Sequence, residues 1–245
     1  MRRELEVWLK LSNHRTIVPL LGTANVGSPL PALVSQWMPS GTLYMYLEQD
    51  MVTTSTKVEL VMGVANGLNY LHSEYVVHGD LHPANVLIDE SGNPRLTDFG
   101  LATVVGDAEL QLNTTTAGLN LNPQWRAPEI IGIHSDDEDP VRPNFKSDVY
   151  SFGGVMFFII SGHTPWKEKR NPHQIIVELL KRATPARRNN IPDNYWNLIQ
   201  QCWSWEPRHR PEVMKVIGSL ATKTTAILVK TERCVFFMYH LYHIY

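Results

Sequence analysis

Apolar residues recur at intervals of three and four along several stretches of this chain, which is the repeat of an amphipathic helix. Residues 3–11 show this repeat at Leu5, Trp8, Leu9 and Leu11. Residues 56–72 show it over a longer span, at Val61, Val64, Ala65, Leu68 and Leu71. Residues 147–162 are apolar nearly all round, which predicts a buried central helix ended by Gly162 and Pro165. Shorter amphipathic helices are expected near 172–182, 193–203 and 211–221.

Strand-like runs lie in the first half of the chain. The runs TIVPLLGTA (16–24) and PALVSQWM (31–38) are separated by a segment rich in turn-forming residues. NVLID (85–89) and RLTDF (95–99) flank the turn ESGNP, which predicts a hairpin. Strands and a helix come first and mostly helices follow. This order predicts an α+β fold in which a small α+β lobe joins a larger helical lobe.

Composition narrows the possible partners and compartment. A formal net charge of −2 over 245 residues gives no electrostatic footprint for nucleic acid or a membrane surface. The densest apolar run, VMFFII at 155–160, is too short to span a bilayer. Only two cysteines occur, Cys202 and Cys234, so neither a disulfide framework nor a cysteine-based zinc site is indicated. We therefore expect a cytoplasmic protein with no nucleic-acid or membrane partner.

Three polar side chains flank the predicted 85–99 hairpin or lie close to it. Each of Asp80, Asn85 and Asp98 alone would be read as a turn or cap former. Together they form a set suited to phosphate chemistry, because a loop aspartate can accept the proton of a hydroxyl. An amide oxygen and a second carboxylate can hold Mg²⁺ against phosphate oxygens. The hairpin is a rigid means of bringing both metal ligands to one ion.

Several motifs in a fixed order carry a resemblance to a known family. They are LVSQWMPSGTL (33–43), HGDLHPAN (78–85), DFG (98–100), APE (127–129), SDVYSFG (147–153) and CWSWEPRHRP (202–211). Over about residues 1–221 the chain resembles a eukaryotic-type protein kinase domain of the tyrosine-kinase-like branch common in fungi. The resemblance implies a bilobal kinase fold, ATP and Mg²⁺ as cofactors, and a protein as substrate.

The resemblance also assigns roles at the reacting centre. It makes Asp80 the catalytic base, Asn85 the second metal ligand and Asp98 the metal ligand of the DFG motif. Ser35 falls at the gatekeeper position, and Gln36 to Met38 form the hinge whose backbone would bind adenine. Leu87 would pack beneath the adenine ring.

Further roles implied by the resemblance are structural. Glu4 matches the helix glutamate that pairs with the phosphate-holding lysine, although a solvated carboxylate at the positive end of a helix dipole is an alternative. Glu129 and Arg210 match a buried ion pair of the helical lobe. A four-residue stack would link the two lobes, and simple core packing would explain the same residues equally well. The stack residues are Trp8, Leu20, His78 and Phe99.

The chain also departs from the family pattern. Neither a glycine-rich loop nor a VAIK-like lysine precedes Glu4, so we expect an N-terminally truncated form. Gly79 replaces the arginine that commonly receives a phosphate from the activation loop, which argues against activation through Thr114, Thr115 or Thr116 by that route. His82 replaces the lysine typical of serine/threonine kinases, and a mostly neutral imidazole neutralises phosphate charge less well at pH 7.

Residues 222–245 match nothing in the family and are rich in aromatic side chains. They could form an interface, but an extension from a mistaken gene boundary is the favoured reading. For residues 1–221 we predict transfer of the ATP γ-phosphate to protein serine or threonine, in preference to tyrosine. A catalytically silent kinase-like module that binds partners is the alternative from another class.

Overall fold

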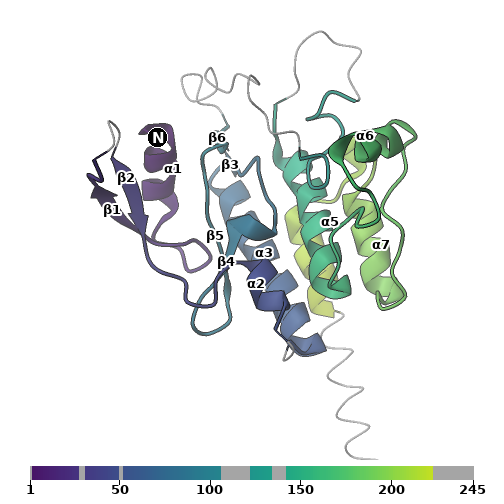
Figure 1. Cartoon of the computed structure of the whole chain (residues 1–245), viewed down its shortest axis with the longest axis horizontal. Helices are drawn as coiled ribbons and strands as arrows, with labels where there is room; N and C mark the ends of the chain where they lie inside the picture. Colours follow the sequence, from purple (N-terminus) through teal and green to yellow (C-terminus); the bar gives the residue numbers. More distant parts are fainter. Residues whose placement is uncertain (1, 28–30, 50–51, 106–121, 134–141, 223–245) are drawn as a thin grey trace, which may run out of the picture.

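A computed structural model describes residues 2–27, 31–49, 52–105, 122–133 and 142–222. In these residues a small unit of one helix and two strands stands beside a larger, mostly helical part (Figure 1). The expected α+β fold with two lobes is confirmed. The acidic segment 134–140, Thr114 to Thr116 and residues 223–245 lie outside the described part.

The small lobe consists of α1 (Arg2–Leu11), β1 (Leu20–Ala24) and β2 (Ala32–Ser35). The two strands pair antiparallel, from Leu20 opposite Ser35 to Ala24 opposite Ala32. Among the described residues this sheet has only these two strands. Both strands are shorter than the apolar runs that predicted them.

The apolar face of α1 differs from the one predicted. Val7, Trp8 and Leu11 are buried, whereas Leu9 is 56% exposed. Leu9 follows Trp8 by one residue, a rotation of about 100° that carries it off the buried face. The Trp8 indole Nε1 donates to the Val18 carbonyl at 2.7 Å, so the helix is also held by a buried polar contact.

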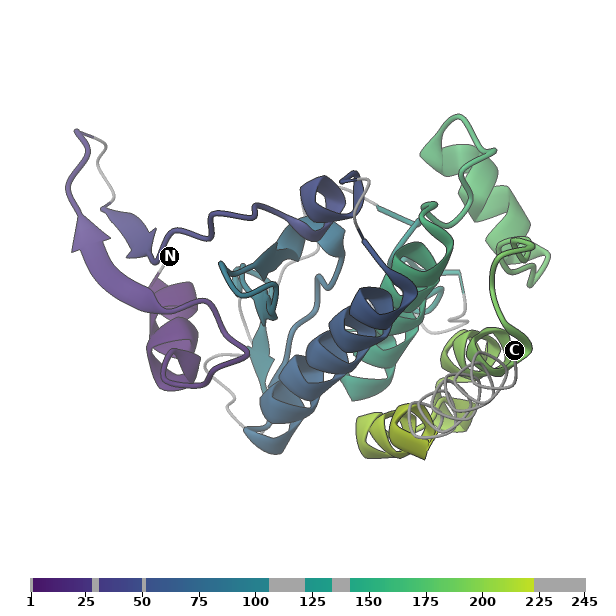
Figure 2. The same ribbon diagram turned by 90° about the horizontal axis from the view of Figure 1, so that it is seen from below.

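The large lobe is built around two long helices, α3 (Thr54–Ser73) and α5 (Phe145–Ser161), which lie side by side (Figure 2). Asn144 caps α5 in a reciprocal arrangement with Ser147, and Gly162 ends it in the left-handed conformation. The lobe is completed by α2 (Leu43–Leu47), α6 (Pro172–Leu180), α7 (Asp193–Cys202), the short 3₁₀ helices η1 (Pro83–Asn85) and η2 (Pro207–His209), and helical residues 213–222.

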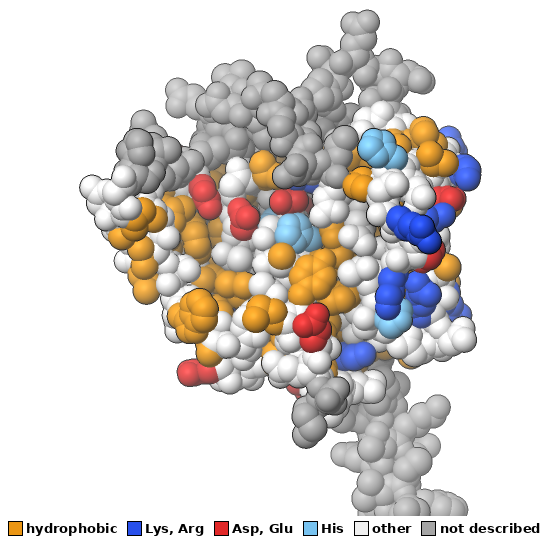
Figure 3. Space-filling view, in the orientation of Figure 1, with side chains coloured by type: hydrophobic (Ala, Val, Ile, Leu, Met, Phe, Trp, Pro, Cys, Tyr) orange, Lys and Arg blue, Asp and Glu red, His pale blue; other side chains and the backbone are white. Residues whose placement is uncertain are grey.

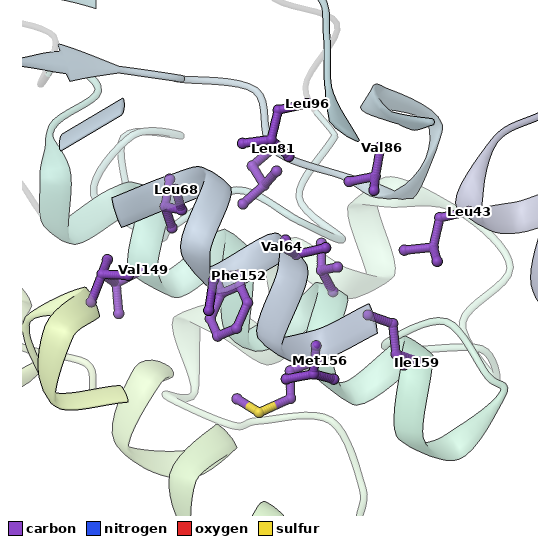
Figure 4. Packing of buried hydrophobic residues seen from close by; sticks show 14 of the residues in the cluster. Leu43, Val64, Leu68, Leu81, Val86, Leu96, Val149, Phe152, Met156 and Ile159 are labelled. Carbon is purple, nitrogen blue, oxygen red and sulfur yellow. The ribbon is translucent and has the colours of Figure 1, made fainter. Parts of the chain in front are cut away.

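One hydrophobic core runs through both lobes. It includes Trp8 from α1 as well as residues of α3 and α5. Figure 4 shows Val64 and Leu68 of α3 facing Phe152 and Met156 of α5. All five apolar positions predicted for the face of α3 are fully buried. Because α5 is covered on every side, its apolar surface finds partners all round, as the pattern predicted.

Two more two-stranded sheets lie between the lobes. The predicted hairpin is present as β4 (Val86–Ile88) and β5 (Pro94–Leu96). The strands β3 (Val76–Val77) and β6 (Thr103–Val104) also pair, and the sequence did not predict them because two residues carry no period. Ile17 forms a parallel bridge with Leu96, so residues before β1 tie the small lobe to this hairpin.

No helix among the described residues is both long enough and apolar enough to cross a membrane.

Candidate active site

A buried carboxylate on α5 holds the backbone of the loop that carries Asp80. Asp148 accepts from the backbone N–H groups of His78 and Gly79, each at 2.9 Å. His72 of α3 adds a third contact, with its Nε2 at 3.0 Å. Three donors on one buried carboxylate fix the loop relative to both central helices. The loop therefore has a rigid base from which a side chain can be aimed.

Gly79 has a physical reason to be glycine. Its φ of +78° lies in the left-handed region, and an added Cβ would come within 2.8 Å of the Leu101 carbonyl oxygen. The backbone at this position accordingly has no room for the arginine that the family commonly places here.

Asp80 stands between two basic side chains. The Arg126 Nη2 lies 3.0 Å from Asp80 Oδ1, and the His82 Nε2 lies 3.7 Å from Oδ2. The other ring nitrogen of His82 accepts from the Ala84 N–H at 3.2 Å, which leaves the proton on the nitrogen that faces Asp80. Burial alone would raise the pKa of Asp80, but the contacts with His82 and Arg126 outweigh it and lower the pKa below its ordinary value. Asp80 is thus held as a carboxylate able to accept a proton.

Asn85 connects Asp80 to Thr97, the residue directly before Asp98. Its side-chain Nδ2 donates to the backbone carbonyl of Asp80 at 3.0 Å. The backbone carbonyl of Asn85 accepts from the Thr97 N–H at 3.1 Å. Because a carbonyl can only accept, the amide nitrogen must face Asp80, and Oδ1 is left as the side-chain atom available to a cation. Hydrogen bonds of Asn85 therefore connect the backbone of Asp80 with Thr97, the residue directly before Asp98.

Asp98 and Glu4 form an acidic pair across Gly100. A Cβ added to Gly100 would lie 3.2 Å from Asp98 Oδ1 and 4.0 Å from Glu4 Oε2. Partial burial raises the pKa of Glu4, and the negative charge of Asp98 raises it further. Glu4 is half-buried in the first turn of α1, beside Asp98, and its role stays a prediction. Figure 3 shows acidic side chains and a histidine in the middle of this face, whereas Lys and Arg gather on the side of the large-lobe helices.

These groups fit Mg²⁺ held together with a polyphosphate. The Asn85 Oδ1 and the Asp98 carboxylate are hard oxygen donors of the kind that Mg²⁺ prefers. No group of three or more His, Cys, Asp or Glu residues in the described part could hold a metal without help. An ion here would need phosphate oxygens to complete its shell, as is usual for Mg²⁺ in nucleotide sites.

The residues proposed to bind adenine line the connection from β2 to α2. Ser35 ends β2, and the Gln36 N–H donates to the Pro19 carbonyl at 2.9 Å. Met38 is buried, and Leu87 of β4 is half-buried and forms an isolated bridge with Thr42. The hinge and the floor of the expected adenine site thus lie on connected backbone.

The structure brings three of the four stack residues into contact. Phe99 meets Trp8 edge to face with ring centroids 6.0 Å apart, and it meets His78 at 5.6 Å. Leu20 is half-buried at the start of β1, where its N–H donates to Ser12 just beyond α1. The DFG phenylalanine therefore connects the small-lobe helix with the loop of Asp80.

Glu129 and Arg210 form a bidentate pair, with Nη1 to Oε1 at 2.5 Å and Nη2 to Oε2 at 2.8 Å. Both side chains are buried. Arg210 also donates to the carbonyls of Ser204 and Lys146, and its guanidinium lies 5.0 Å from the centre of the Tyr150 ring.

Sequence reasoning missed Arg126 and Asp148. Both lie in quoted motifs or next to them: Arg126 directly precedes APE, and Asp148 is the aspartate of SDVYSFG. Their positions were visible, but their partners are 46 and 69 to 70 residues away in the chain. Only the tertiary structure identifies those partners.

Comparison with known proteins matches residues 1–220 to the model of the protein tyrosine and serine/threonine kinase family. The chain belongs to this family. The kinase domain spans nearly all of the described residues, and its motifs are those that form the site above.

Related proteins include both serine/threonine and tyrosine kinases. The domain is 31% identical over 230 residues to the Raf homolog serine/threonine-protein kinase of Caenorhabditis elegans, covering 86% of this chain and 26% of that protein. It is 29% identical over 213 residues to tyrosine-protein kinase FRK of Homo sapiens, covering 85% and 40%. It is 28% identical over 213 residues to the dual specificity protein kinase pyk3 of Dictyostelium discoideum, covering 86% and 15%. The chain spans less than half the length of each of these relatives.

Proposed function

We propose that this kinase domain transfers the γ-phosphate of ATP to serine or threonine hydroxyls of a protein substrate, with Mg²⁺ as the metal. The observation that supports this most strongly is the pair of hydrogen bonds by which Asn85 joins the backbone of Asp80 to Thr97, next to Asp98. The proposed compartment is the cytoplasm, and no nucleic-acid or membrane partner is proposed.

In the proposed reaction Asp80 accepts the proton of the substrate hydroxyl. The hydroxyl oxygen forms a bond to the γ-phosphorus, and the bond from that phosphorus to the bridging oxygen breaks, so that ADP leaves with the electron pair. Asn85 and Asp98 would hold Mg²⁺, which when bound neutralises charge on the phosphate oxygens. Phe99 and the anchored loop keep Asp80 in place during the step.

Serine and threonine are proposed over tyrosine because of the loop DLHPAN (80–85). It does not follow the tyrosine-kinase pattern well. The relatives include kinases of both kinds, so the proposal rests on this loop. Peptide arrays that present all three acceptor residues would decide between them, and preferential labelling of tyrosine would contradict the proposal.

The test compares the 245-residue chain with a chimera. In the chimera, strands that carry the glycine-rich loop and the lysine of a related kinase precede residue 1. Loss of one preorganised electrostatic contact commonly costs on the order of 10²–10³ in rate. We therefore expect the chain itself to transfer ³²P from Mg²⁺·ATP to a generic basic protein near background, and the chimera to be active.

Asp80→Asn should abolish the activity of the chimera, since an amide cannot accept the proton. Asp193→Asn is the matched control, because Asp193 is an exposed carboxylate at the start of α7. Robust transfer by the unextended chain, or transfer that survives Asp80→Asn, would contradict the mechanism.

The second candidate is a catalytically silent kinase-like module that binds partners. His82, which stands where serine/threonine kinases commonly have a lysine, favours it. An inactive chimera that binds Mg²⁺·ATP weakly or not at all would support this candidate over the kinase.

A further inference from the structure

Arg126 is a buried cation whose hydrogen bonds are incomplete. Its side chain is 7% exposed, and its Nη2 lies 3.0 Å from Asp80 Oδ1. Its Nε is also buried and has no hydrogen-bond partner in the described part of the chain. A buried guanidinium N–H without a partner is costly, so an acceptor is expected to reach it in the working protein.

Phosphoryl transfer next to Asp80 requires a positive charge. The phosphoryl group carries negative charge on three oxygens, and it must approach a hydroxyl that is itself hydrogen-bonded to the Asp80 carboxylate. Like charges at this separation repel each other strongly in a partly buried site. A cation between carboxylate and phosphoryl group removes that repulsion.

The loop that carries Asp80 does not supply this cation by itself. Within DLHPAN the only basic residue is His82, and an imidazole is not a permanent cation as a guanidinium is. The His82 Nε2 is also farther from the carboxylate, at 3.7 Å, than the guanidinium of Arg126. Arginine stays charged at every pH that the protein meets.

We propose, building on the kinase function proposed above, that Arg126 is the cation of the transfer site. The guanidinium Nη2 holds the Asp80 carboxylate, and the neighbouring Nε, on the same edge, donates to an oxygen of the transferred phosphoryl group. The planar fork of five N–H donors suits this double contact, because it can bind two oxyanions at once. Arg126 thus takes the place that a lysine at position 82 would have, although it approaches from the segment before APE.

The binding test uses the 245-residue chain and measures the affinities for Mg²⁺·ATP and Mg²⁺·ADP by NMR titration into the millimolar range. Only ATP carries the γ-phosphate. Arg126→Gln should therefore weaken ATP binding about tenfold, which is typical of losing one charge-assisted hydrogen bond, and leave ADP binding unchanged. Arg126→Lys should keep part of the preference for ATP.

A relocated charge gives the decisive variant. His82→Lys in the Arg126→Gln background should restore the preference for ATP, because it puts a cation back beside Asp80. In the unchanged chain His82→Lys should raise that preference less than about threefold, since a cation is already present. Only the arm in the unchanged chain is independent of whether Arg126→Gln folds.

Arg95→Gln is the matched control. Arg95 also forms a 3.0 Å pair with an aspartate, Asp89, but on the hairpin formed by β4 and β5. It should leave the ratio of ATP to ADP affinity unchanged. Equal effects of Arg126→Gln on both nucleotides, or on neither, would overturn the assignment. A parent chain that binds neither nucleotide would overturn this inference, whereas the activity of the chimera decides the proposed function separately.

Discussion

Arg210 is the largest side chain that the fold buries completely, and its contacts explain how a full charge is tolerated there. Its guanidinium meets the two carboxylate oxygens of Glu129 and the carbonyls of Ser204 and Lys146. A buried charge of this kind is stabilising only as a set, because each group relies on the others for its solvation. At the scale of single residues the same rule applies to Asp148, which three donors surround.

Replacing Arg210 with Ala should destabilise the protein by about 3–5 kcal/mol, because the Glu129 carboxylate would remain buried without its partner. Chemical denaturation followed by circular dichroism measures the change. Arg187→Ala is the control: Arg187 pairs with Asp193 at 2.5 Å, but both are exposed, and such pairs contribute about 0–1 kcal/mol. Equal changes in unfolding free energy for the two substitutions would contradict the argument that burial makes the Glu129–Arg210 pair costly to break.

Gly79→Ala should cost more than a left-handed backbone alone. A non-glycine residue in this region loses about 1–2 kcal/mol, and at Gly79 the new Cβ would also meet the Leu101 carbonyl oxygen at 2.8 Å. Gly162 provides the comparison, since its φ is +73° and a Cβ there has nothing within 4 Å. Denaturation of both variants should show Gly79→Ala as the less stable one. The reverse order would contradict the steric argument.

The β4–β5 and β1–β2 hairpins differ in how much of the protein packs against them. The β4–β5 hairpin packs against α3, and Leu96 is part of the common core. The β1–β2 hairpin has exposed apolar side chains on both strands, Leu21 and Val34, and its described part has no third strand. Isolated two-stranded sheets are marginally stable in water. The two hairpins should therefore differ in stability.

Hydrogen exchange should reveal this difference. Amides within residues 4–38 are expected to exchange much faster than those within 53–221, because local opening near an unpaired sheet edge needs little free energy. The β4–β5 hairpin is the internal control and should be protected like α3. The 245-residue chain is also expected to self-associate through the edge of β1–β2. Strong protection across 4–38 in a soluble monomer would contradict the prediction.

At the scale of the whole molecule, the two lobes meet through packed aromatic side chains. Trp8 of α1 and Phe99 contact each other, and Phe99 contacts His78 of the loop anchored on α5. Phe99 thus links α1 of the small lobe to the loop that carries Asp80, and that loop is anchored on α5. A change in the charge of His78 should therefore change the free energy of unfolding of the protein.

Stability should fall when the pH is lowered below about 6.5. Burial lowers the pKa of His78, and the charges of Asp148, Asp80 and Asp98 only partly oppose this. The unfolded chain takes up a proton that the folded one excludes, so stability is fully present above this pH. Below it, stability decreases by up to about 1.4 kcal/mol per pH unit from this residue. Denaturation at pH 7.5, 6.5 and 5.5 tests this, and His78→Phe should flatten the dependence.

The sequence alone determined the elements whose signal is local. The apolar face of α3 follows from side-chain period, the burial of α5 follows from its nearly continuous apolar residues, and the β4–β5 turn follows from ESGNP. The order of short motifs was enough to place Asp80, Asn85 and Asp98 in one predicted site. Period and turn chemistry act over a few residues, which is why they can be read without a structure.

The tertiary structure decided which charges meet. Arg126 and Asp80 are 46 residues apart, and Glu129 and Arg210 are 81 apart. No local sequence pattern marks Arg126 as the neighbour of Asp80, because the two residues lie in separate segments of the chain. The same holds for Leu9, whose spacing allowed burial until the packing of α1 turned it to solvent. Long-range contacts depend on how elements pack, and packing is a property of the entire chain.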